Sequence, residues 1–281
     1  MSSGSMTGRM QLGSQLRRLR EDRGISRAEA GYAIRASESK ISRLELGRVG
    51  SKTRDVQDLL ALYGVTDDAQ ITEIMNLAAE ANKPGWWQAY NDLLPSWLAT
   101  YLGLEEAASR LRSYSVQFIP ELLQTEEYAR ALLASARSRG GHEELDRHVE
   151  ITLRRQRAFF RPGGPRLWAV LDEAVLHRTV GDPGTHRDQL RHLLTLKGVT
   201  LQVLPFSAGE HPAQSGGFTL LRFPQAELGD IAYVQSLAGS THHEKIEEVD
   251  VHLQAMEHLC VAAHTPEYSA KLIADLARAR P

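Results

Sequence analysis

Cysteine is almost absent from this chain of 281 residues, because Cys260 is the only one. A single thiol cannot form a disulfide within one chain, and it cannot build a cysteine-based zinc site. Cys260 lies in an apolar helical stretch, where we expect it to be a small core residue. The composition therefore excludes a disulfide scaffold and favours a reducing compartment.

Long hydrophobic runs are missing as well. No apolar run approaches the roughly eighteen residues that a membrane-spanning helix needs. The first residues, MSSGSMTGRMQLGS, lack the hydrophobic segment of a signal peptide. We therefore expect a cytoplasmic protein with no membrane partner, in which residues 1–10 form a disordered tail.

The motifs of common catalytic sites are also missing. The sequence contains no G-x-S-x-G elbow, no P-loop and no G-x-G-x-x-G motif. His211 and Ser215 would complete a hydrolase-like set with a carboxylate, but nothing in the sequence places them together. His252 and His258 are six residues apart on a predicted helix and point in different directions. We expect neither an enzyme nor a site for a metal or cofactor.

Charge is present but unevenly distributed. Residues 1–54 hold twelve Lys and Arg against five Asp and Glu, a net charge of +7. The whole chain has a net charge of −2, so the remainder carries −9. A basic segment joined to an acidic body is typical of a protein that meets nucleic-acid phosphates at one end only. The length and the 42% hydrophobic content predict about two globular domains.

Residues 12–63 divide into short helices separated by turn residues. The first helix places Leu12, Leu16 and Leu19 on one face and ends near Gly24. Ser26 with Glu29 three residues later predicts a capping box at the start of the second helix.

The third helix follows Ser37, a good N-cap, and ends at Gly47. Its inward residues are Ile41 and Leu44. The small Gly31 lies where the second helix must approach the third closely. The outward face of the third helix then carries Glu38, Ser39, Ser42 and Arg43.

This arrangement resembles the phage-repressor type of helix-turn-helix in the Xre-like superfamily, over about residues 12–63. The resemblance depends on residues 24–27, Gly31 and residues 37–47. In that family the second helix of the motif lies in the major groove of DNA. The resemblance implies that base edges are read by Glu38, Ser39, Lys40, Ser42 and Arg43. It implies that phosphates are contacted by Arg27, Arg48 and Lys52, and that Arg20 and Glu45 form a structural pair.

One position departs from the family pattern. The turn between the second and third helices usually contains a glycine, because its backbone tends toward positive φ, yet this turn has Arg35 and Ala36. A left-handed residue other than glycine costs about 1–2 kcal/mol.

The alternative interpretation of residues 12–63 is a small helical bundle whose charged residues form a solvated face. The two caps, Gly31 and the local charge of +7 together favour DNA binding.

A domain boundary is predicted at residues 83–85, Lys-Pro-Gly. It separates a helix-turn-helix domain over 11–82 from a C-terminal domain over 86–281. Residues 86–161 are expected to be mostly helical, and strands are expected at 166–171, 200–204, 218–223 and 231–237, with helices at 172–179, 186–196, 244–263 and 266–279. The fold class is α+β: an all-α bundle, a mostly helical region and an α/β portion with a sheet of about four strands.

The whole order of features resembles actinobacterial regulators that join an Xre-like helix-turn-helix to a C-terminal domain of unknown function, an antitoxin-like group that includes WhiJ-type regulators. The segments that carry it are Trp86-Trp87 with Tyr90, 119–128, Arg155-Gln156, 171–176, Gln189-Leu190 and 203–206. Glu121 and Gln235 depart from the usual residues. The resemblance implies a transcriptional regulator, commonly with a small companion protein encoded nearby, and it names no ligand.

Two groups of residues are candidates for a ligand or partner pocket in the C-terminal domain. The aromatic group is Trp86, Trp87, Tyr90 and Tyr128, for which simple domain packing is the alternative. The acidic group is Asp172 and Glu173, at the predicted carboxyl end of a strand. Helix capping is the alternative for this pair.

Three hypotheses on function follow. The first is a transcriptional regulator that binds double-stranded DNA as a homodimer on an inverted repeat, with a C-terminal domain that senses a ligand or partner. The second is an antitoxin-like protein that binds a small companion protein and regulates its own expression. The third is a sensor of a small-molecule effector.

Overall fold

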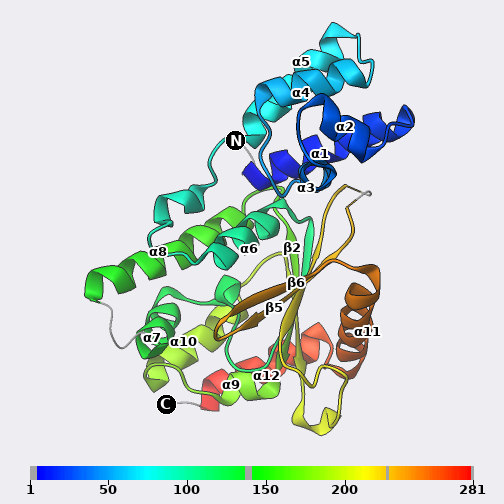
Figure 1. The fold of residues 1–281 in the computed structure, drawn as a ribbon. Helices are drawn as coiled ribbons and strands as arrows, with labels where there is room; N and C mark the ends of the chain where they lie inside the picture. Colours follow the sequence, from blue (N-terminus) through cyan, green and yellow to red (C-terminus); the bar gives the residue numbers. More distant parts are fainter. Residues whose placement is uncertain (1–4, 137–140, 226–227, 280–281) are drawn as a thin grey trace. The chain divides into compact units, whose positions relative to one another are not determined.

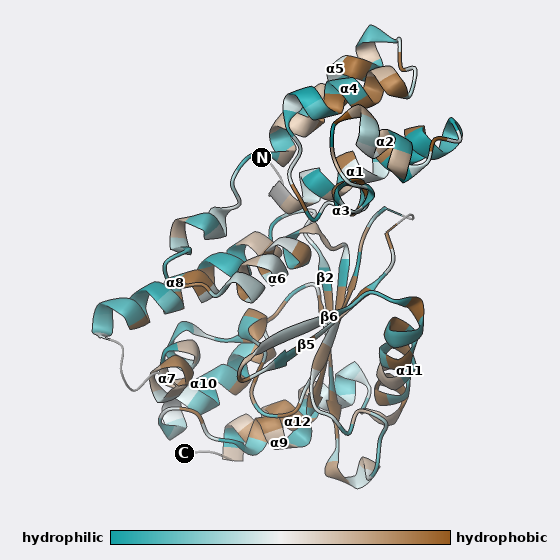
Figure 2. Cartoon of the chain, in the orientation of Figure 1, coloured by the Kyte–Doolittle hydropathy of each residue, from teal (hydrophilic) through white to brown (hydrophobic). Residues whose placement is uncertain are grey.

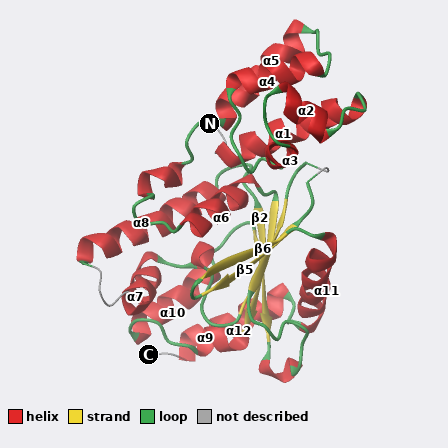
Figure 3. Cartoon of the chain, in the orientation of Figure 1, coloured by secondary structure: helices red, strands yellow, loops and turns green. Residues whose placement is uncertain are grey.

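The computed structural model describes residues 5–136, 141–225 and 228–279 (Figure 1). The chain divides into two compact units: the first comprises residues up to Ala108 together with Phe223–Gly229, and the second comprises Ser109–Arg222 and the residues from Asp230 onward. The first unit is helical and the second contains a six-stranded sheet, which confirms the α+β class (Figure 3).

The helices of the first unit are α1 (Ser5–Asp22), α2 (Arg27–Ala33), α3 (Glu38–Glu45), α4 (Thr53–Leu62), α5 (Asp68–Ala81), the 3-10 helix η1 (Trp86–Tyr90) and α6 (Ser96–Ala107). Figure 2 shows both hydrophobic and hydrophilic residues along α1 to α5, as expected for helices that bury one face. The buried faces meet in one core, which includes Leu12, Leu16, Ile41, Leu44, Val56, Leu59, Leu60 and Tyr63.

Residues 5–10 are helical, so the predicted disordered tail is wrong for these residues. Met6 and Met10, four residues apart on α1, are both buried. A side chain at Gly8 would place its Cβ 3.0 Å from the Cα of Ala81 on α5, so the two helices are in close contact there. The small and polar composition concealed the helix, because its stability comes from tertiary packing. Residues 1–4 lie outside the described residues.

The first unit extends beyond residues 83–85, where the sequence predicts a domain boundary, and it includes Trp86–Ala108. The indole of Trp87 is buried, and a Cβ at Gly103 would lie 3.3 Å from it. The same Cβ would lie 3.1 Å from the side chain of Met6. Residues 86–108 therefore pack with the helical bundle.

The second unit contains β1 (Arg110–Ser115), β2 (Arg166–Asp172), β3 (Val199–Leu204), β4 (Phe218–Arg222), β5 (Ile231–Ser236) and β6 (Gly239–His243). Its helices are η2 (Glu121–Leu123), α7 (Glu126–Ala136), α8 (His142–Phe159), α9 (Glu173–His177), α10 (Pro183–Leu193), η3 (Phe206–Ala208), α11 (Ile246–Ala262) and α12 (Pro266–Ala279). The strand order is β3-β2-β1-β4-β5-β6. Strands β1 to β3 are parallel, and the pairings from β1 to β6 through β4 and β5 are antiparallel.

The four predicted strands are confirmed as β2 to β5, but the sheet has six strands rather than about four. Strand β1 lies in a segment that was predicted to be helical. Its sequence, Arg-Leu-Arg-Ser-Tyr-Ser, is polar, and it forms a strand because it pairs with β2 on one side and β4 on the other. Strand β6, Gly-Ser-Thr-His-His, is also polar, and it forms a strand because it pairs with β5.

Helices cover both faces of the sheet in the second unit. On one face Met256 and Leu259 of α11 pack in a core with Val170 and Ala232. Figure 1 shows α7, α8 and α10 on the opposite side of the sheet from α11. Helices α7, α8 and α10 lie in the connections that join the parallel strands β1, β2 and β3, whereas α11 follows β6. The carboxyl ends of these three parallel strands lie at the same end of the sheet, and Asp172 is the last residue of β2.

Candidate nucleic-acid interface

Both helices of the predicted helix-turn-helix begin where the capping residues place them. The Oγ of Ser26 accepts a hydrogen bond from the Glu29 N–H at 3.2 Å, and the Ser26 N–H donates to the Glu29 carboxylate at 2.7 Å. This confirms the capping box. The Ser26 N–H also lowers the pKa of Glu29. Ser37 caps α3 by accepting from the Lys40 N–H at 3.2 Å.

The turn between α2 and α3 has the predicted left-handed residue. Arg35 has φ +52°, and it is the only residue other than glycine with positive φ among those the structure describes. The turn is tight, because the Ala36 N–H donates to the Gly31 carbonyl at 2.8 Å. A Cβ at Gly31 would lie 2.8 Å from the Ala36 carbonyl oxygen, so only glycine fits there.

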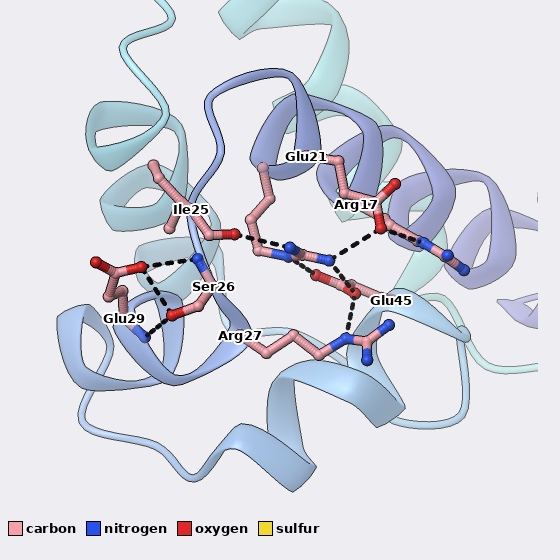
Figure 4. A network of polar contacts seen from close by, with 8 residues as sticks. Arg17, Glu21, Ile25, Ser26, Arg27, Glu29 and Glu45 are labelled. Carbon is pink, nitrogen blue, oxygen red and sulfur yellow. Dashed lines mark hydrogen bonds and ion pairs between the residues drawn. The ribbon is translucent and has the colours of Figure 1, made fainter.

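A buried carboxylate links three helices of the motif (Figure 4). Glu45, at the end of α3, has a side chain that is only 2% exposed. Its Oε1 accepts from Arg20 Nε at 2.5 Å, and its Oε2 accepts from Arg20 Nη2 and Arg27 Nε, each at 3.1 Å. Arg20 also donates to the Ile25 carbonyl at 2.8 Å. The structure therefore pairs Arg20 with Glu45, and it adds Arg27 as a partner that the sequence did not indicate.

The same ion pair determines the electrostatics of this core. The hydrogen bond that Arg20 donates to the Glu45 carboxylate is the main cause of a raised pKa for Arg20, which keeps the guanidinium charged. Burial raises the pKa of Tyr63, and the nearby Glu45 charge raises it further. Two charges and a neutral phenol are thus held together away from water.

Helices α1 and α3 approach each other closely at Gly13. A Cβ at this position would lie 2.4 Å from the Glu45 carbonyl oxygen and 2.5 Å from that of Leu44. The sequence alone does not indicate the role of Gly13, because a glycine inside a helix is an unfavourable residue unless a close neighbour requires it. Gly13 allows α1 to support the end of α3 directly.

The predicted base-reading residues all lie on α3, and they differ in exposure. Glu38, Ser39 and Arg43 are exposed, and Ser42 is half-buried. Arg43 Nε donates to the Ser39 carbonyl at 3.3 Å, one helical turn back. Lys40 is half-buried, and its Nζ lies 2.9 Å from Asp55 of α4. Lys40 therefore joins α3 to α4, which the sequence did not predict.

The three predicted phosphate-contacting residues flank this exposed face. The Arg27 side chain is 37% exposed, and Figure 4 shows its two terminal nitrogens pointing away from the Glu45 carboxylate. Arg48 is exposed just beyond α3, where its backbone N–H donates to the Arg43 carbonyl at 2.8 Å. Lys52 is exposed at the start of α4. Basic side chains thus come from three successive segments of the motif.

The aromatic residues Trp86, Trp87 and Tyr90 lie in η1 of the first unit. Trp87 and Tyr90 are buried and Trp86 is half-buried. The Trp86 ring contacts the other two edge-on, at 5.9 Å from Trp87 and 6.3 Å from Tyr90 between ring centroids. Their contacts are those of a packed aromatic cluster.

The other pocket candidates lie in the second unit and have local partners. Tyr128 is fully buried, and its hydroxyl accepts from the Ile119 N–H at 3.3 Å. Asp172 caps α9 by accepting from the Ala174 N–H at 2.9 Å. Glu173 accepts from the Phe206 N–H at 2.8 Å. The capping alternative therefore describes the contacts of Asp172.

A tyrosine that the sequence analysis missed connects Asp172 to the loop after β3. The hydroxyl of Tyr114 on β1 lies 3.3 Å from Asp172 Oδ2 and 3.2 Å from His211 Nε2. Burial raises the pKa of Tyr114, with the Asp172 charge as the next cause. The phenol therefore keeps its proton and donates a hydrogen bond to the Asp172 carboxylate, and the same hydroxyl lies within hydrogen-bond distance of His211.

Glutamine side chains fix the segment around η2. Gln156 Nε2 donates to the carbonyls of Glu121 and Gln124, at 2.7 and 2.9 Å. Gln189 donates to the Leu123 carbonyl at 2.7 Å and accepts from the Thr125 N–H at 2.6 Å. Arg155 pairs with the carboxylate of Glu121, so Glu121, which departs from the family pattern, has a structural partner. These sequence motifs serve the scaffold.

Two further properties concern the part of the chain that the structure describes. It contains no group of three or more His, Cys, Asp or Glu that could hold a metal ion. None of its helices combines the length and the apolar character needed to cross a membrane.

The comparisons with known proteins agree with the division into a helical motif and a larger second part. Residues 11–73 match the model of a helix-turn-helix domain (HTH_31). Residues 98–275 match the model of a family described as "Domain of unknown function (DUF5753)". No curated protein and no solved structure matches the chain. A helix-turn-helix domain is typical of DNA-binding regulators. Because the second match covers more than half of the chain, this protein belongs to the DUF5753 family and carries a helix-turn-helix domain at its N-terminal end.

Proposed function

We propose that this chain is a sequence-specific transcriptional regulator of the Xre-like, WhiJ-type group that acts in the cytoplasm and binds an inverted repeat as a homodimer. The observation that carries the proposal is the exposed face of α3, with Glu38, Ser39 and Arg43, on a motif that two caps and the Glu45 ion pairs hold in place. In this proposal α3 enters the major groove, and a twofold axis of the protein coincides with that of the operator.

The side chains on α3 have the chemistry needed to read base edges. An arginine can donate two hydrogen bonds to guanine O6 and N7, and a glutamate can accept one from cytosine N4. Arg43 would release its contact with the Ser39 carbonyl to reach a base. Arg27 has its Nε held by Glu45, which orients the terminal nitrogens toward a phosphate.

Two variants separate base reading from phosphate contact. Arg43→Ala is expected to cost about 1–3 kcal/mol and to relax the preference at one base pair. Arg27→Ala is expected to weaken binding to all sequences and to reduce the salt slope by about 1. The measurement is a titration of the upstream region of the gene and of random DNA at several salt concentrations, followed by footprinting.

The control is Arg278→Ala, an exposed arginine of α12 that pairs with Asp275 in the second unit. It should leave both the base preference and the salt slope unchanged. If Arg43→Ala and Arg27→Ala weakened binding to all sequences alike, the division into reading and phosphate-contacting residues would be wrong. If the wild-type chain protected no specific sequence, the proposed function would fail.

We further propose that the second unit regulates the first by binding, without catalysis. The groups from which a catalytic set would be built are engaged locally: Asp172 and His211 through Tyr114, and Glu173 through the Phe206 N–H. Its target is either a small companion protein, as in the antitoxin-like hypothesis, or a small-molecule effector. Co-purification from the native host tests the first, and a thermal-shift screen of host metabolites tests the second.

A further inference from the structure

The two edges of the six-stranded sheet differ. At the β3 edge, the Val203 N–H donates to Ser269 Oγ at 2.9 Å, and the Val203 carbonyl accepts from the His264 N–H at 2.8 Å. The segment that leads into α12 therefore occupies this edge. Native proteins commonly cover sheet edges in such ways, because an open edge is a template for another strand.

The opposite edge is β6, which pairs with β5 and with no other strand among the residues that the structure describes. The β5–β6 hairpin closes at Ser236 and Gly239 through the two residues Leu237 and Ala238. In an antiparallel hairpin with a two-residue turn, the N–H and C=O groups of the closing pair face the partner strand. Along each strand these backbone groups then point alternately away from the partner and toward it. The backbone groups of Gly239 and Thr241 therefore face β5, whereas those of residues 240 and 242 face the outer edge.

We propose that this edge pairs with β6 of a second copy, antiparallel about a twofold axis through Thr241. The proposal rests on the homodimer of the proposed function and names its contact surface. The register is self-complementary. Residue 240 of each copy lies opposite residue 242 of the other, so each outward-facing residue meets an outward-facing partner. At the axis Thr241, which is exposed, lies opposite its own copy, a favourable cross-strand pair.

Two exposed aliphatic side chains support a second copy as the occupant. Leu237 at the tip of the hairpin is fully exposed, and Ile246 at the start of α11 is 74% exposed. In the register centred on Thr241, residue 237 of one copy lies opposite residue 245 of the other. The tip of each hairpin thus comes beside the first turn of the other α11, and Leu237 and Ile246 gain apolar partners. An unrelated strand would match the backbone but would leave Ile246 exposed.

Ser240→Pro tests the pairing with little risk to the fold. Its N–H faces outward, so proline removes no bond to β5 but blocks the edge, where proline is tolerated in sheets. Ser240→Ala is the matched control, because it keeps the N–H and because no hydrogen bond to Ser240 Oγ occurs among the described residues. In sedimentation velocity we expect dimers for wild type and Ser240→Ala. We expect the dissociation constant of Ser240→Pro to rise at least about tenfold, with an unchanged circular dichroism spectrum.

Charged variants at the axis provide a second test, which does not depend on proline being tolerated. Thr241→Lys and Thr241→Glu each place like charges opposite one another and should weaken the homodimer. A mixture of the two should form heterodimers in preference to either homodimer. A monomeric wild type at about 100 times the concentration at which it protects DNA would overturn the proposal. The proposal would also be overturned if the dissociation constant of the dimer were the same as wild type in all three variants, Ser240→Pro, Thr241→Lys and Thr241→Glu.

The same variants distinguish this interface from the proposed function. Ser240→Pro leaves every residue of α2 and α3 intact, so it should still bind one half-site with the wild-type base preference while losing affinity for the full inverted repeat. If wild-type protein dimerised through β6 but protected no operator, the interface would stand and the proposed function would fail. If folded Ser240→Pro remained dimeric and still protected the inverted repeat, the interface would be wrong and the proposed function would stand.

Discussion

Glu45→Gln is the substitution with the largest calculable effect on the helix-turn-helix. The change keeps the shape of the side chain but removes the negative charge that meets both Arg20 and Arg27. Arg20 would then keep a buried positive charge with only neutral acceptors and Glu21 at 3.3 Å, which is largely exposed. Breaking a buried ion pair by removing one partner costs about 3–5 kcal/mol.

The expected loss is large enough for a thermal melt. For a unit of this size, 1 kcal/mol corresponds to a change in Tm of about 4–8 °C. The transition of the first unit should therefore fall by roughly 12 °C or more. We would record circular dichroism melts of the full chain. The transition whose Tm falls relative to wild type would be assigned to the first unit.

The control for this measurement is Glu21→Gln. Glu21 contacts the same Arg20 but its side chain is 49% exposed, so its loss should cost no more than about 1 kcal/mol. The double variant Arg20→Met with Glu45→Leu should recover most of the lost stability, because a buried pair can be replaced by apolar residues at little cost. A loss below about 1 kcal/mol for Glu45→Gln would refute the argument, since that is the value of a solvated surface pair.

Two other predictions concern packing and pH. Gly13→Ala should destabilise the first unit by about 1–3 kcal/mol or more, because the new Cβ meets backbone carbonyl oxygens at 2.4 and 2.5 Å. The measurement is chemical denaturation, and the control is Gly141→Ala, at a glycine with open space around it. Equal losses of unfolding free energy in the two variants would contradict the reasoning. The raised pKa of buried Tyr63 means that its contribution to stability is complete below about pH 10 and is lost as pH rises above that value. Tyr63→Phe should therefore make the loss of unfolding free energy above pH 10 shallower, by up to about 1.4 kcal/mol per pH unit, and an unchanged slope would contradict this.

Features that depend on neighbouring residues in the sequence could be predicted. The capping box at Ser26 and the cap at Ser37 each follow from a few adjacent residues. Strands β2 to β5 were found because each contains a hydrophobic segment bounded by turn residues. For such features the local pattern and the tertiary structure favour the same conformation.

Features that depend on distant segments could not be predicted. Strand β1 is polar, and only pairing with β2 and β4 makes it a strand. The helical start of α1 needs Ala81 of α5 as a neighbour. The attachment of Arg27 to Glu45 joins residues eighteen positions apart, and no spacing rule relates them. In each case the decisive partner is known only once the chain is folded.

The covered β3 edge also has a consequence for the order in which the chain folds during synthesis. Both backbone groups of Val203 find their partners in residues 264 and 269, close to the C-terminal end. While the ribosome is still adding these residues, β3 has been made but its outer edge is open. The helices α1 to α6 are complete long before that moment, since domains fold as units and N-terminal ones fold first. The nascent sheet is therefore most prone to aggregation in the interval between the synthesis of β3 and that of α12.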